Sequence, residues 1–425
     1  MQTLIDFITF KDPNVIYVVL GMICINTSSA VIGTFAFLRK RALIGDAIAH
    51  ALLPGVCLGF ILAGDKNIIY LLGGAFLTGW LATFLVDYIV NQTKIKQDAA
   101  IGIVLSTLFA FGIVLMSVIQ NGDYANEGGL NNFLFGQAAA INKDEVYIFG
   151  IILLVILVAT YFFYRAFLSI SFNYDFAASA GLPVKTIEFV LTSLTVLAIA
   201  AGIQALGVVL MSALIITPAA AARFWSNNLR VMLLIAVVFS VFSGVLGAYV
   251  SYANAGVPTG PWVVLILSLI TIISFVFSTK KGILYRILLA NKNKRKIFTE
   301  NILKSIFQWH EKKQKDIAEP FAAADLLSVR LFSTRELNKG LVKLKQKGLL
   351  VADGTKFYLS AEGIVESKRI VRLHRLWEHY LLRRTSMDEN HVHAGAEAIE
   401  HVLSPEIEKE LEKELGILGI PKDDY

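Results

Sequence analysis

The sequence predicts an all-α polytopic membrane bundle of about nine helices, followed by a cytoplasmic part with a winged-helix domain and a helical, dimerisation-like region. Two observations support this fold class. The chain has 425 residues, of which 56% are hydrophobic, and its mean hydropathy of +0.62 exceeds that of ordinary soluble proteins. The apolar residues form long runs that end near Ser278, and the remainder is a charged sequence typical of a soluble domain.

Each apolar run is close to the roughly 20 residues that a helix needs to cross a bilayer. The sixth and seventh runs have almost no polar break between them, and we expect the turn within 202–207, because glycine permits a tight reversal. Asn26 and Gln204 are expected to form hydrogen bonds between helices. The predicted spans are Val15–Leu38, Ala42–Leu62, Ile68–Val90, Ala99–Ile119, Val146–Tyr164, Ile187–Ala205, Leu206–Ala222, Val231–Tyr252 and Trp262–Ser278.

Basic residues predict how the bundle is oriented. Arg39, Lys40 and Arg41 follow the first span, and every second loop after it carries further bases, whereas the loops between them carry few. Since basic loops stay on the cytoplasmic side, an odd number of spans puts the amino end outside and the carboxyl part in the cytoplasm. These bases also account for the pI near 9.1, which therefore does not indicate a nucleic-acid partner.

A carboxylate and an imidazole lie inside the second apolar run. Asp46 and His50 are four residues apart, so a helix places both side chains on one face. Ionisable groups inside a membrane segment usually mark a pathway or a site, and this pair suits a divalent transition-metal ion. Alternatively, Asp46 caps its helix and His50 bonds a neighbouring helix. The only cysteines, Cys24 and Cys57, offer neither a disulfide framework nor a cysteine zinc site.

A short cytoplasmic segment, 172–183, separates the fifth and sixth spans. It predicts a small helix that ends at a glycine, followed by a proline. Such a helix suits the docking of a soluble partner, and the alternative is a simple connector at the membrane surface.

Several stretches together resemble the metal-uptake ABC permease family of the manganese, zinc and iron type. They keep the family order over nearly all of residues 15–280, and they are 38–55, 97–103, 133–136, 180–183, 209–220 and 257–260. The resemblance implies a permease in a prokaryotic plasma membrane that imports a divalent metal ion, with manganese favoured over iron or zinc. It makes Asp46 and His50 the candidates for the metal pathway.

The resemblance also implies the partners. They are a second permease copy, an extracellular metal-binding lipoprotein, the surrounding membrane lipid and a separate ABC ATPase. The chain has no phosphate-binding Gly-x-x-x-x-Gly-Lys-Ser/Thr motif, so we expect it to bind no nucleotide and to be no enzyme. The candidate residues for docking the ATPase are Asp175, Phe176, Ala180, Gly181, Leu182 and Pro183.

The charged part predicts further domains after the membrane domain of 1–282. A basic linker, 283–298, precedes a winged-helix domain at 299–366 and a helical metal-binding region at 367–425. The winged-helix prediction depends on a helix at Thr299–Lys313, on short helical pieces at 315–319 and 322–328, and on a longer helix that starts with a capping box of Ser333 and Glu336. That helix places Leu337, Leu341 and Leu344 on one face, and an Asp-Gly hairpin at 349–359 follows it.

The helix after Ser333 is basic. Arg335, Lys339 and Lys343 could contact DNA phosphates. The first turn offers no further base-reading side chains beyond Arg335, and a membrane tether disfavours a search of the chromosome. We therefore favour a solvated or protein-binding surface over nucleic acid as the role of this face.

The sequence from Val371 onward resembles the iron-dependent (diphtheria toxin) repressor family. That resemblance implies a regulatory metal site on His374, Glu378, His393, Glu397, Glu400 and His401. Glu397 favours the manganese-responsive branch, since an oxygen ligand suits manganese. At two positions where the family's first helix also donates ligands, this chain has Asn301 and Lys304, and a charged lysine cannot ligate a metal.

Three functions remain open at this point. The first is a permease whose cytoplasmic domain senses metal and regulates uptake. The second is a membrane-tethered, metal-responsive DNA-binding regulator. The third is a permease with a purely structural tail.

Overall fold

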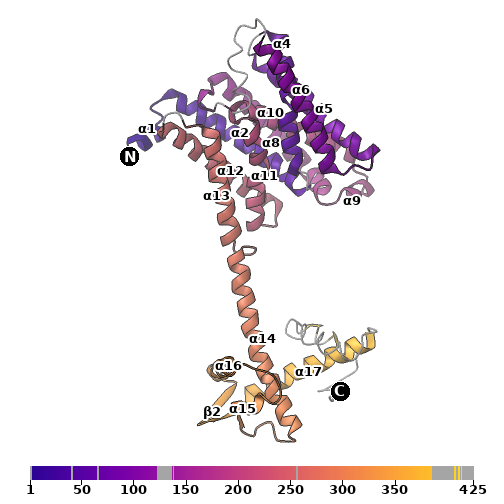
Figure 1. The fold of residues 1–425 in the computed structure, drawn as a ribbon, viewed down its shortest axis with the longest axis vertical. Coiled ribbons are helices and arrows are strands. Elements are labelled where there is room, and N and C mark those ends of the chain that lie inside the picture. The colour runs from indigo at the N-terminus through magenta and orange to yellow at the C-terminus, as the bar shows by residue number, and fades with distance from the viewer. Residues whose placement is uncertain are drawn as a thin grey trace. The chain divides into compact units, whose positions relative to one another are not determined.

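The computed structural model describes residues 2–39, 42–64, 67–121, 136, 138–254, 257–384, 406–407, 410–411 and 413. The chain divides into two compact units, Met1–Arg286 and Ile287–Tyr425. Figure 1 labels the elements of both units, and each unit is described by itself.

The first unit is a bundle of helices that pack side by side (Figure 1). Within the described residues, eight helical stretches are long and apolar enough to cross a membrane, with α3 and α4 counted as one. They are α2 (Pro13–Leu38), α3 (Ala42–Ala51) with α4 (Leu53–Ala63), α5 (Ile68–Gln92), α6 (Gln97–Gln120), α8 (Lys143–Phe172), α10 (Val184–Leu206), α12 (Leu229–Ala253) and α13 (Thr259–Phe277). Shorter helices are α1 (Gln2–Ile8), η1 (Ala138–Ala140), α9 (Tyr174–Ser179) and α11 (Val208–Trp225).

The sequence predicts nine spans and the described residues contain eight candidates, and the difference lies at the seventh predicted span. Helix α11 stands where Leu206–Ala222 was expected; its 18 residues reach about 27 Å, at the short end of the lengths that cross a ~30 Å bilayer core, and its apolar stretch Leu210–Trp225 is not counted among the eight. The break before it lies where the sequence predicts a turn. Gly207 separates α10 from α11 with φ 83° and ψ 164°, a conformation that glycine adopts without strain.

The second predicted span, Ala42–Leu62, is interrupted. Helix α3 ends at Ala51, and α4 begins at Leu53 with Pro54 in its first turn. Proline has no N–H, so Pro54 cannot donate the helical hydrogen bond to the carbonyl of His50. The break therefore follows from the sequence, although the prediction overlooked it.

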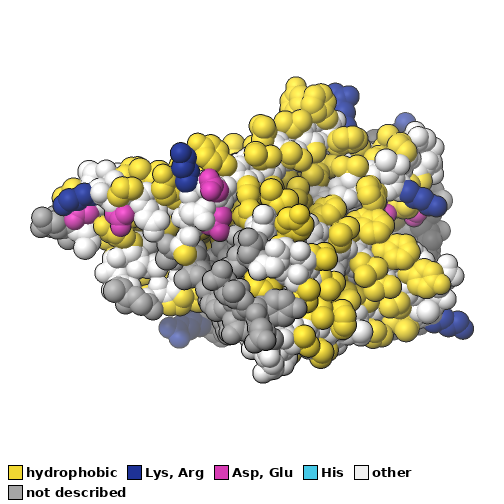
Figure 2. Space-filling view, turned by 90° about the horizontal axis from the view of Figure 1, so that it is seen from above, with side chains coloured by type: hydrophobic (Ala, Val, Ile, Leu, Met, Phe, Trp, Pro, Cys, Tyr) yellow, Lys and Arg dark blue, Asp and Glu magenta, His cyan; other side chains and the backbone are white. Residues whose placement is uncertain are grey.

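Helix α2 lies at the centre of the bundle and packs against α8, α10, α11 and α12. Gly33 allows its closest approach, since a Cβ built there would lie 2.0 Å from the carbonyl oxygen of Ile215 on α11. The outer surface is apolar instead of polar, as Figure 2 shows for one face. Tyr161 and Phe162 on α8 are 80% and 76% exposed, which is the pattern expected of side chains that face lipid.

Polar side chains inside the bundle pair across helices, as the sequence predicts for Asn26 and Gln204. Asn26 on α2 accepts a hydrogen bond from Ser240 on α12 over 3.0 Å. Gln204 on α10 donates to Glu145 on α8 over 2.6 Å. Each pair fixes the rotation of one helix against another.

The second unit combines helices with a small antiparallel sheet of strand order β1-β3-β2. Its elements are α14 (Ile283–Lys312), which begins four residues before the unit boundary, β1 (Phe321–Ala322), α15 (Ala323–Leu326), α16 (Thr334–Gln346), β2 (Leu350–Asp353), β3 (Lys356–Leu359) and α17 (Ala361–Arg384). Their apolar faces form one core, which consists of Ile302, Leu303, Ile306, Trp309, Phe321, Leu326, Leu337, Leu341, Leu344, Leu350, Leu359 and Ile370.

Several predictions for this unit are confirmed. Leu337, Leu341 and Leu344 on α16 are all buried. The hairpin β2–β3 forms with Ala352 opposite Phe357, and Gly354 in its turn has φ 58°.

Three local predictions are wrong. The helix predicted to begin at Thr299 already begins at Ile283, because the Leu, Ala, Lys and Arg residues before Thr299 are strong helix formers. Residues 315–319 form turns, and the piece at 322–328 shortens to α15. Ser333 is the N-cap of α16, but its side chain makes no capping hydrogen bond, so the predicted capping box does not form.

Candidate metal pathway and cytoplasmic sites

Asp46 and His50 lie on one face of α3, as their spacing predicts. The His50 Nε2 atom and the Asp46 Oδ1 atom are 3.6 Å apart, and the two side chains are 23% and 42% exposed. Asp46 is four residues past the first residue of α3, too far along to cap the first turn. Among the described residues, the buried His50 Nδ1 atom has no hydrogen-bond partner, so the alternative of a bond to a neighbouring helix finds no support.

The neighbours of α3 hold this pair in place. The ring of Phe109 on α6 meets the His50 imidazole edge-on, with centroids 5.0 Å apart. Helix α11 also lies against α3, since a Cβ built on Gly45 would meet side-chain atoms of Ile215 at 3.6 Å, an ordinary contact distance. A carboxylate and an imidazole held together in this way can share a divalent cation.

The described part of one chain supplies too few ligands for a complete metal site at this place. Within the described residues, no group of three or more His, Cys, Asp and Glu side chains is arranged to hold a metal ion. The pair can therefore contact an ion on its way but does not enclose it.

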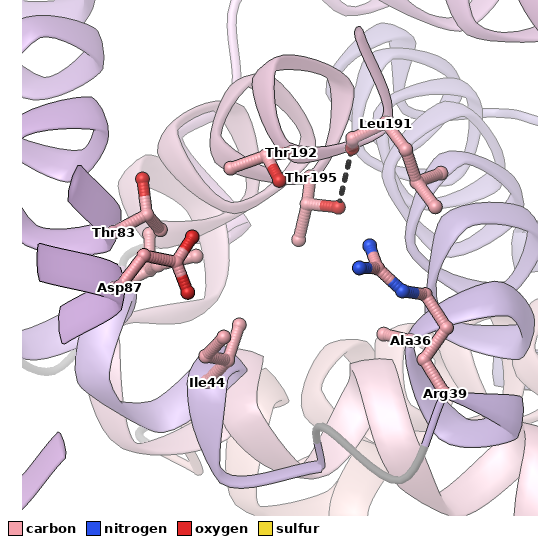
Figure 3. A pocket seen from close by; sticks show the side chains of 9 residues that line it. Ala36, Arg39, Ile44, Thr83, Asp87, Leu191, Thr192 and Thr195 are labelled. Carbon is pink, nitrogen blue, oxygen red and sulfur yellow. Dashed lines mark hydrogen bonds between the residues drawn. The ribbon is translucent and has the colours of Figure 1, made fainter. Parts of the chain in front are cut away.

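A pocket opens where α2, α3, α5 and α10 meet. Figure 3 shows that Arg39, the C-cap of α2, and Asp87 on α5 face the pocket from opposite sides. Thr195 on α10 donates a hydrogen bond to the carbonyl of Leu191 over 2.8 Å. Arg39 also forms an ion pair with Glu188 at the start of α10. That ion pair joins two segments 149 positions apart in the sequence.

Helix α9 has the short helical form that the sequence predicts for the segment after the fifth span. Asn173 caps it by accepting a hydrogen bond from the N–H of Phe176 over 3.0 Å. Gly181 ends it with φ 80°, and the N–H of Leu182 donates to the carbonyl of Ala177 over 3.2 Å in a Schellman motif.

One side of this segment faces outward. Phe176 is 67% exposed, and Ala177 beneath it is buried against the bundle. The other predicted docking residues, Asp175, Ala180, Gly181 and Pro183, are exposed, and Leu182 is half-buried. The segment therefore presents an apolar ring on a rigid turn.

The second unit brings two of its six predicted ligands together. His374 Nε2 and Glu378 Oε1 on α17 are 3.0 Å apart, and both residues are buried. His393, Glu397, Glu400 and His401 lie outside the described residues.

Arg375, the residue after His374, is buried and connects α17 to α14. Arg375 donates to Glu311 over 2.6 Å. Lys304 on α14 is only 2% exposed, and the Oδ1 atom of Asn301 is buried without a hydrogen-bond partner among the described residues.

The basic face of α16 is directed away from the core of the second unit. Arg335 and Lys339 are exposed, and Lys343 is half-buried. The leucines of the same helix occupy the opposite, buried face, which gives α16 its strongly two-sided character.

Comparison with known proteins identifies the family. Residues 11–278 match the model of the ABC 3 transport family, which is well over half of the chain. The chain belongs to this family. Residues 360–419 match a second model, the iron dependent repressor, metal binding and dimerisation domain. Both resemblances seen in the sequence are thereby confirmed.

Characterised relatives in the family cover most of this chain. The manganese transport system membrane protein MntC of Bacillus subtilis is 34% identical over 383 residues, which is 90% of this chain and 87% of that protein. The zinc transport system membrane protein TroC of Treponema pallidum is 40% identical over 278 residues, which is 65% of this chain and 93% of that protein.

A solved structure shares the fold. PsaBC from Streptococcus pneumoniae, in complex with Fab, matches with 32% identity and a TM-score of 0.60, over 65% of this chain and 97% of that chain. The chain is thus the multi-pass permease subunit of a bacterial ABC transporter and is not itself the ATPase.

Sequence reasoning missed the parts of these sites that depend on distant contacts. It gave no sign that Phe109 would lie against His50. The proline four residues after His50 was a local signal for the break in the helix. No local pattern could have paired Arg39 with Glu188.

Proposed function

We propose that this permease imports a divalent transition-metal ion, manganese first and zinc or iron after it, and that Asp46 and His50 contact the ion during passage. The observation that supports this most directly is the pair itself, an aligned carboxylate and imidazole 3.6 Å apart within a membrane span. The metals carried by the relatives from Bacillus subtilis and Treponema pallidum favour manganese or zinc.

The small number of ligands is compatible with transport. Two side chains bind an ion weakly, and a second permease copy that faces the first would raise the number of ligands to four. A weak site releases its ion quickly, whereas a fully enclosed site would trap it. We therefore infer that the working unit contains two copies of this chain and that an extracellular metal-binding lipoprotein delivers the ion.

We also infer that the ATPase subunit docks on α9 and the turn after it. Support comes from the exposed Phe176 ring, the Asp175 carboxylate and the rigid Schellman turn at Gly181. A docking element must transmit force, and a turn with its backbone hydrogen bonds satisfied resists deformation better than an open loop.

The cytoplasmic part is proposed to sense metal. We assign 299–366 to a winged-helix domain and 367–425 to a metal-binding and dimerisation region, with 283–298 as the connection to the membrane domain of 1–282. The proposed ligands are His374, Glu378, His393, Glu397, Glu400 and His401. Bound metal would inhibit uptake only if the domain prefers the resting state of the transporter when metal is bound.

Metal uptake by proteoliposomes tests the proposed pathway. The transporter is reconstituted with its ATPase, and Asp46→Asn and His50→Gln are compared with Asp98→Asn, which removes a carboxylate from the exposed first turn of α6. Loss of even an outer partner of a metal ligand costs about 10- to 100-fold, so we expect uptake to fall at least that far in the two pathway variants. Uptake equal to that of Asp98→Asn would refute the assignment.

The regulatory role has a separate test. His374→Gln and Glu378→Gln should abolish the inhibition of uptake by metal inside the vesicles. His379→Gln, a half-buried histidine on the same helix that is not a proposed ligand, should keep that inhibition. Equal inhibition in all three variants would leave the tail as a structural element.

A further inference from the structure

The first half of α14 carries an apolar stretch followed by a basic one. Every residue from 283 to 296 is exposed. Six of the first seven residues are large and apolar, with exposed fractions between 39% and 60%, and they are Ile283, Leu284, Tyr285, Ile287, Leu288 and Leu289. We call these residues the apolar collar.

A ring of positive charge follows directly. Lys292, Lys294, Arg295 and Lys296 lie within five residues, and no acidic residue occurs between 283 and 296. Lys296 pairs with Glu300 over 3.6 Å. We call the other three residues the basic collar.

The apolar collar is wider than a single stripe of the helix. At 100° per residue, seven consecutive residues complete about two turns and rise about 10 Å. The six apolar residues therefore cover about 240° of the circumference, more than one stripe, and Arg286 lies in the remaining sector. A protein partner would require a single apolar face, whereas lipid can surround a helix on all sides.

The start of α14 is fixed to the cytoplasmic end of the bundle. The hydroxyl of Ser278 donates to the carbonyl of Phe224 over 2.6 Å, and Lys281 donates to the carbonyl of Arg223 over 3.1 Å. Only five residues separate the end of α13 at Phe277 from Ile283. The apolar collar must therefore begin at the level of the membrane surface.

We propose that the first half of α14 is a lipid-binding segment that takes the anionic headgroups of the bilayer in which the transporter sits. The apolar collar lies in the boundary between headgroups and acyl chains, a zone about 5–10 Å deep that matches its height. The basic collar lies beyond it at the phosphates, where each basic residue strengthens binding about fivefold. Arg286, inside the apolar collar, extends its guanidinium to the same phosphates.

The consequence is a dependence on lipid composition. A segment held by anionic headgroups keeps α14 at the membrane surface, and zwitterionic lipid leaves the apolar collar in water. This inference does not depend on which metal the permease carries.

The test measures the accessibility of one collar residue in the full chain. The Leu288→Cys variant is placed in nanodiscs of phosphatidylcholine with or without phosphatidylglycerol, and its reaction with a water-soluble maleimide is followed by mass spectrometry of the peptide that contains residue 288. We expect labelling about tenfold slower in the anionic discs and fast again in 1 M salt, where the screening length falls to about 3 Å.

Charge variants show which residues are responsible. Lys292→Gln/Lys294→Gln/Arg295→Gln should restore fast labelling in anionic discs, since three bases contribute on the order of 100-fold. Lys312→Gln/Lys313→Gln/Lys345→Gln removes the same charge from exposed sites elsewhere and should leave labelling slow.

Three results would overturn the proposal. Fast labelling in both lipid mixtures would mean that the collar is in water. Slow labelling in both, with no effect of salt, would mean that a protein surface or apolar insertion alone covers it. Fast labelling in the control variant would mean that net charge matters and the basic collar does not.

Discussion

The close approach of α2 and α11 gives the sharpest test of the membrane packing. A Cβ built on Gly33 would lie 2.0 Å from the carbonyl oxygen of Ile215, whereas ordinary contact begins at 3.4 Å. The Gly33→Ala substitution must therefore move two backbones apart by about 1.4 Å, since no flexible side chain lies between them. Overpacking of this kind costs about 1–3 kcal/mol.

A second glycine provides the matched control. Gly150 on α8 has no neighbour within 4 Å of its built Cβ, so Gly150→Ala adds the same methyl group to open space. Alanine in a helix interior is favoured over glycine by about 0.5–1 kcal/mol. We expect Gly150→Ala to unfold at the same temperature as the parent protein or higher, and Gly33→Ala to unfold at a lower temperature.

The assay is thermal unfolding of the purified transporter, combined with metal uptake. Ile215 also contacts Gly45, one residue before Asp46, so the displacement in Gly33→Ala should lower uptake as well as stability. If Gly33→Ala and Gly150→Ala unfold at the same temperature, the two helices are not in the contact described, and the reasoning fails.

Three further predictions concern single contacts. Arg39→Gln should lower the free energy of unfolding by about 1–3 kcal/mol, because Glu188 loses a charged partner, and a double-mutant cycle with Glu188→Gln should show that the two effects are not additive. Gly181→Val places a branched residue at φ 80°, which costs at least about 1–2 kcal/mol, and should uncouple ATP hydrolysis from uptake without loss of the bundle. In the second unit, hydrogen bonds from Arg369, with a smaller effect of nearby positive charge, hold the pKa of Glu366 below its ordinary value of 4.5. Because the pKa of Glu366 is lower in the folded state than in the unfolded state, the contact stabilises the protein at pH values above the unfolded pKa. This stabilisation is lost as the pH falls through the folded pKa. At neutral pH, the free energy of unfolding of Arg369→Gln should therefore be lower than that of the parent protein, by less than about 1 kcal/mol, because both side chains are a third or more exposed. In acid, the two proteins should be equally stable.

The spans could be predicted because their signal is local. A membrane helix satisfies its backbone within itself and must be apolar over about 20 residues, so Ile68–Val90 and Val231–Tyr252 were placed within three residues of α5 and α12. The hairpin at 349–359 was equally local, since Asp-Gly sets the turn. The start of α14 was missed because charge was taken as a mark of a linker, although lysine and arginine favour helices.

The surroundings of the metal pair could not be predicted in the same way. The spacing of Asp46 and His50 placed them on one face, but their partners come from α6 and α11. Phe109 and Ile215 are 59 and 165 residues beyond His50, and only packing shows that they lie beside α3. A single sequence contains no periodic signal for such contacts.

These distant contacts connect the two ends of the bundle. The backbone of Ile215 lies against Gly33 on α2, and its side chain lies against Gly45 on α3. The carboxyl end of the same helix, α11, is held by Ser278 and Lys281 at the start of the cytoplasmic part. Close packing transmits displacement, so a shift of α11 at its cytoplasmic end must alter the contacts of α3 beside Asp46. The geometry of the Asp46–His50 pair is therefore coupled to the segment that precedes α14.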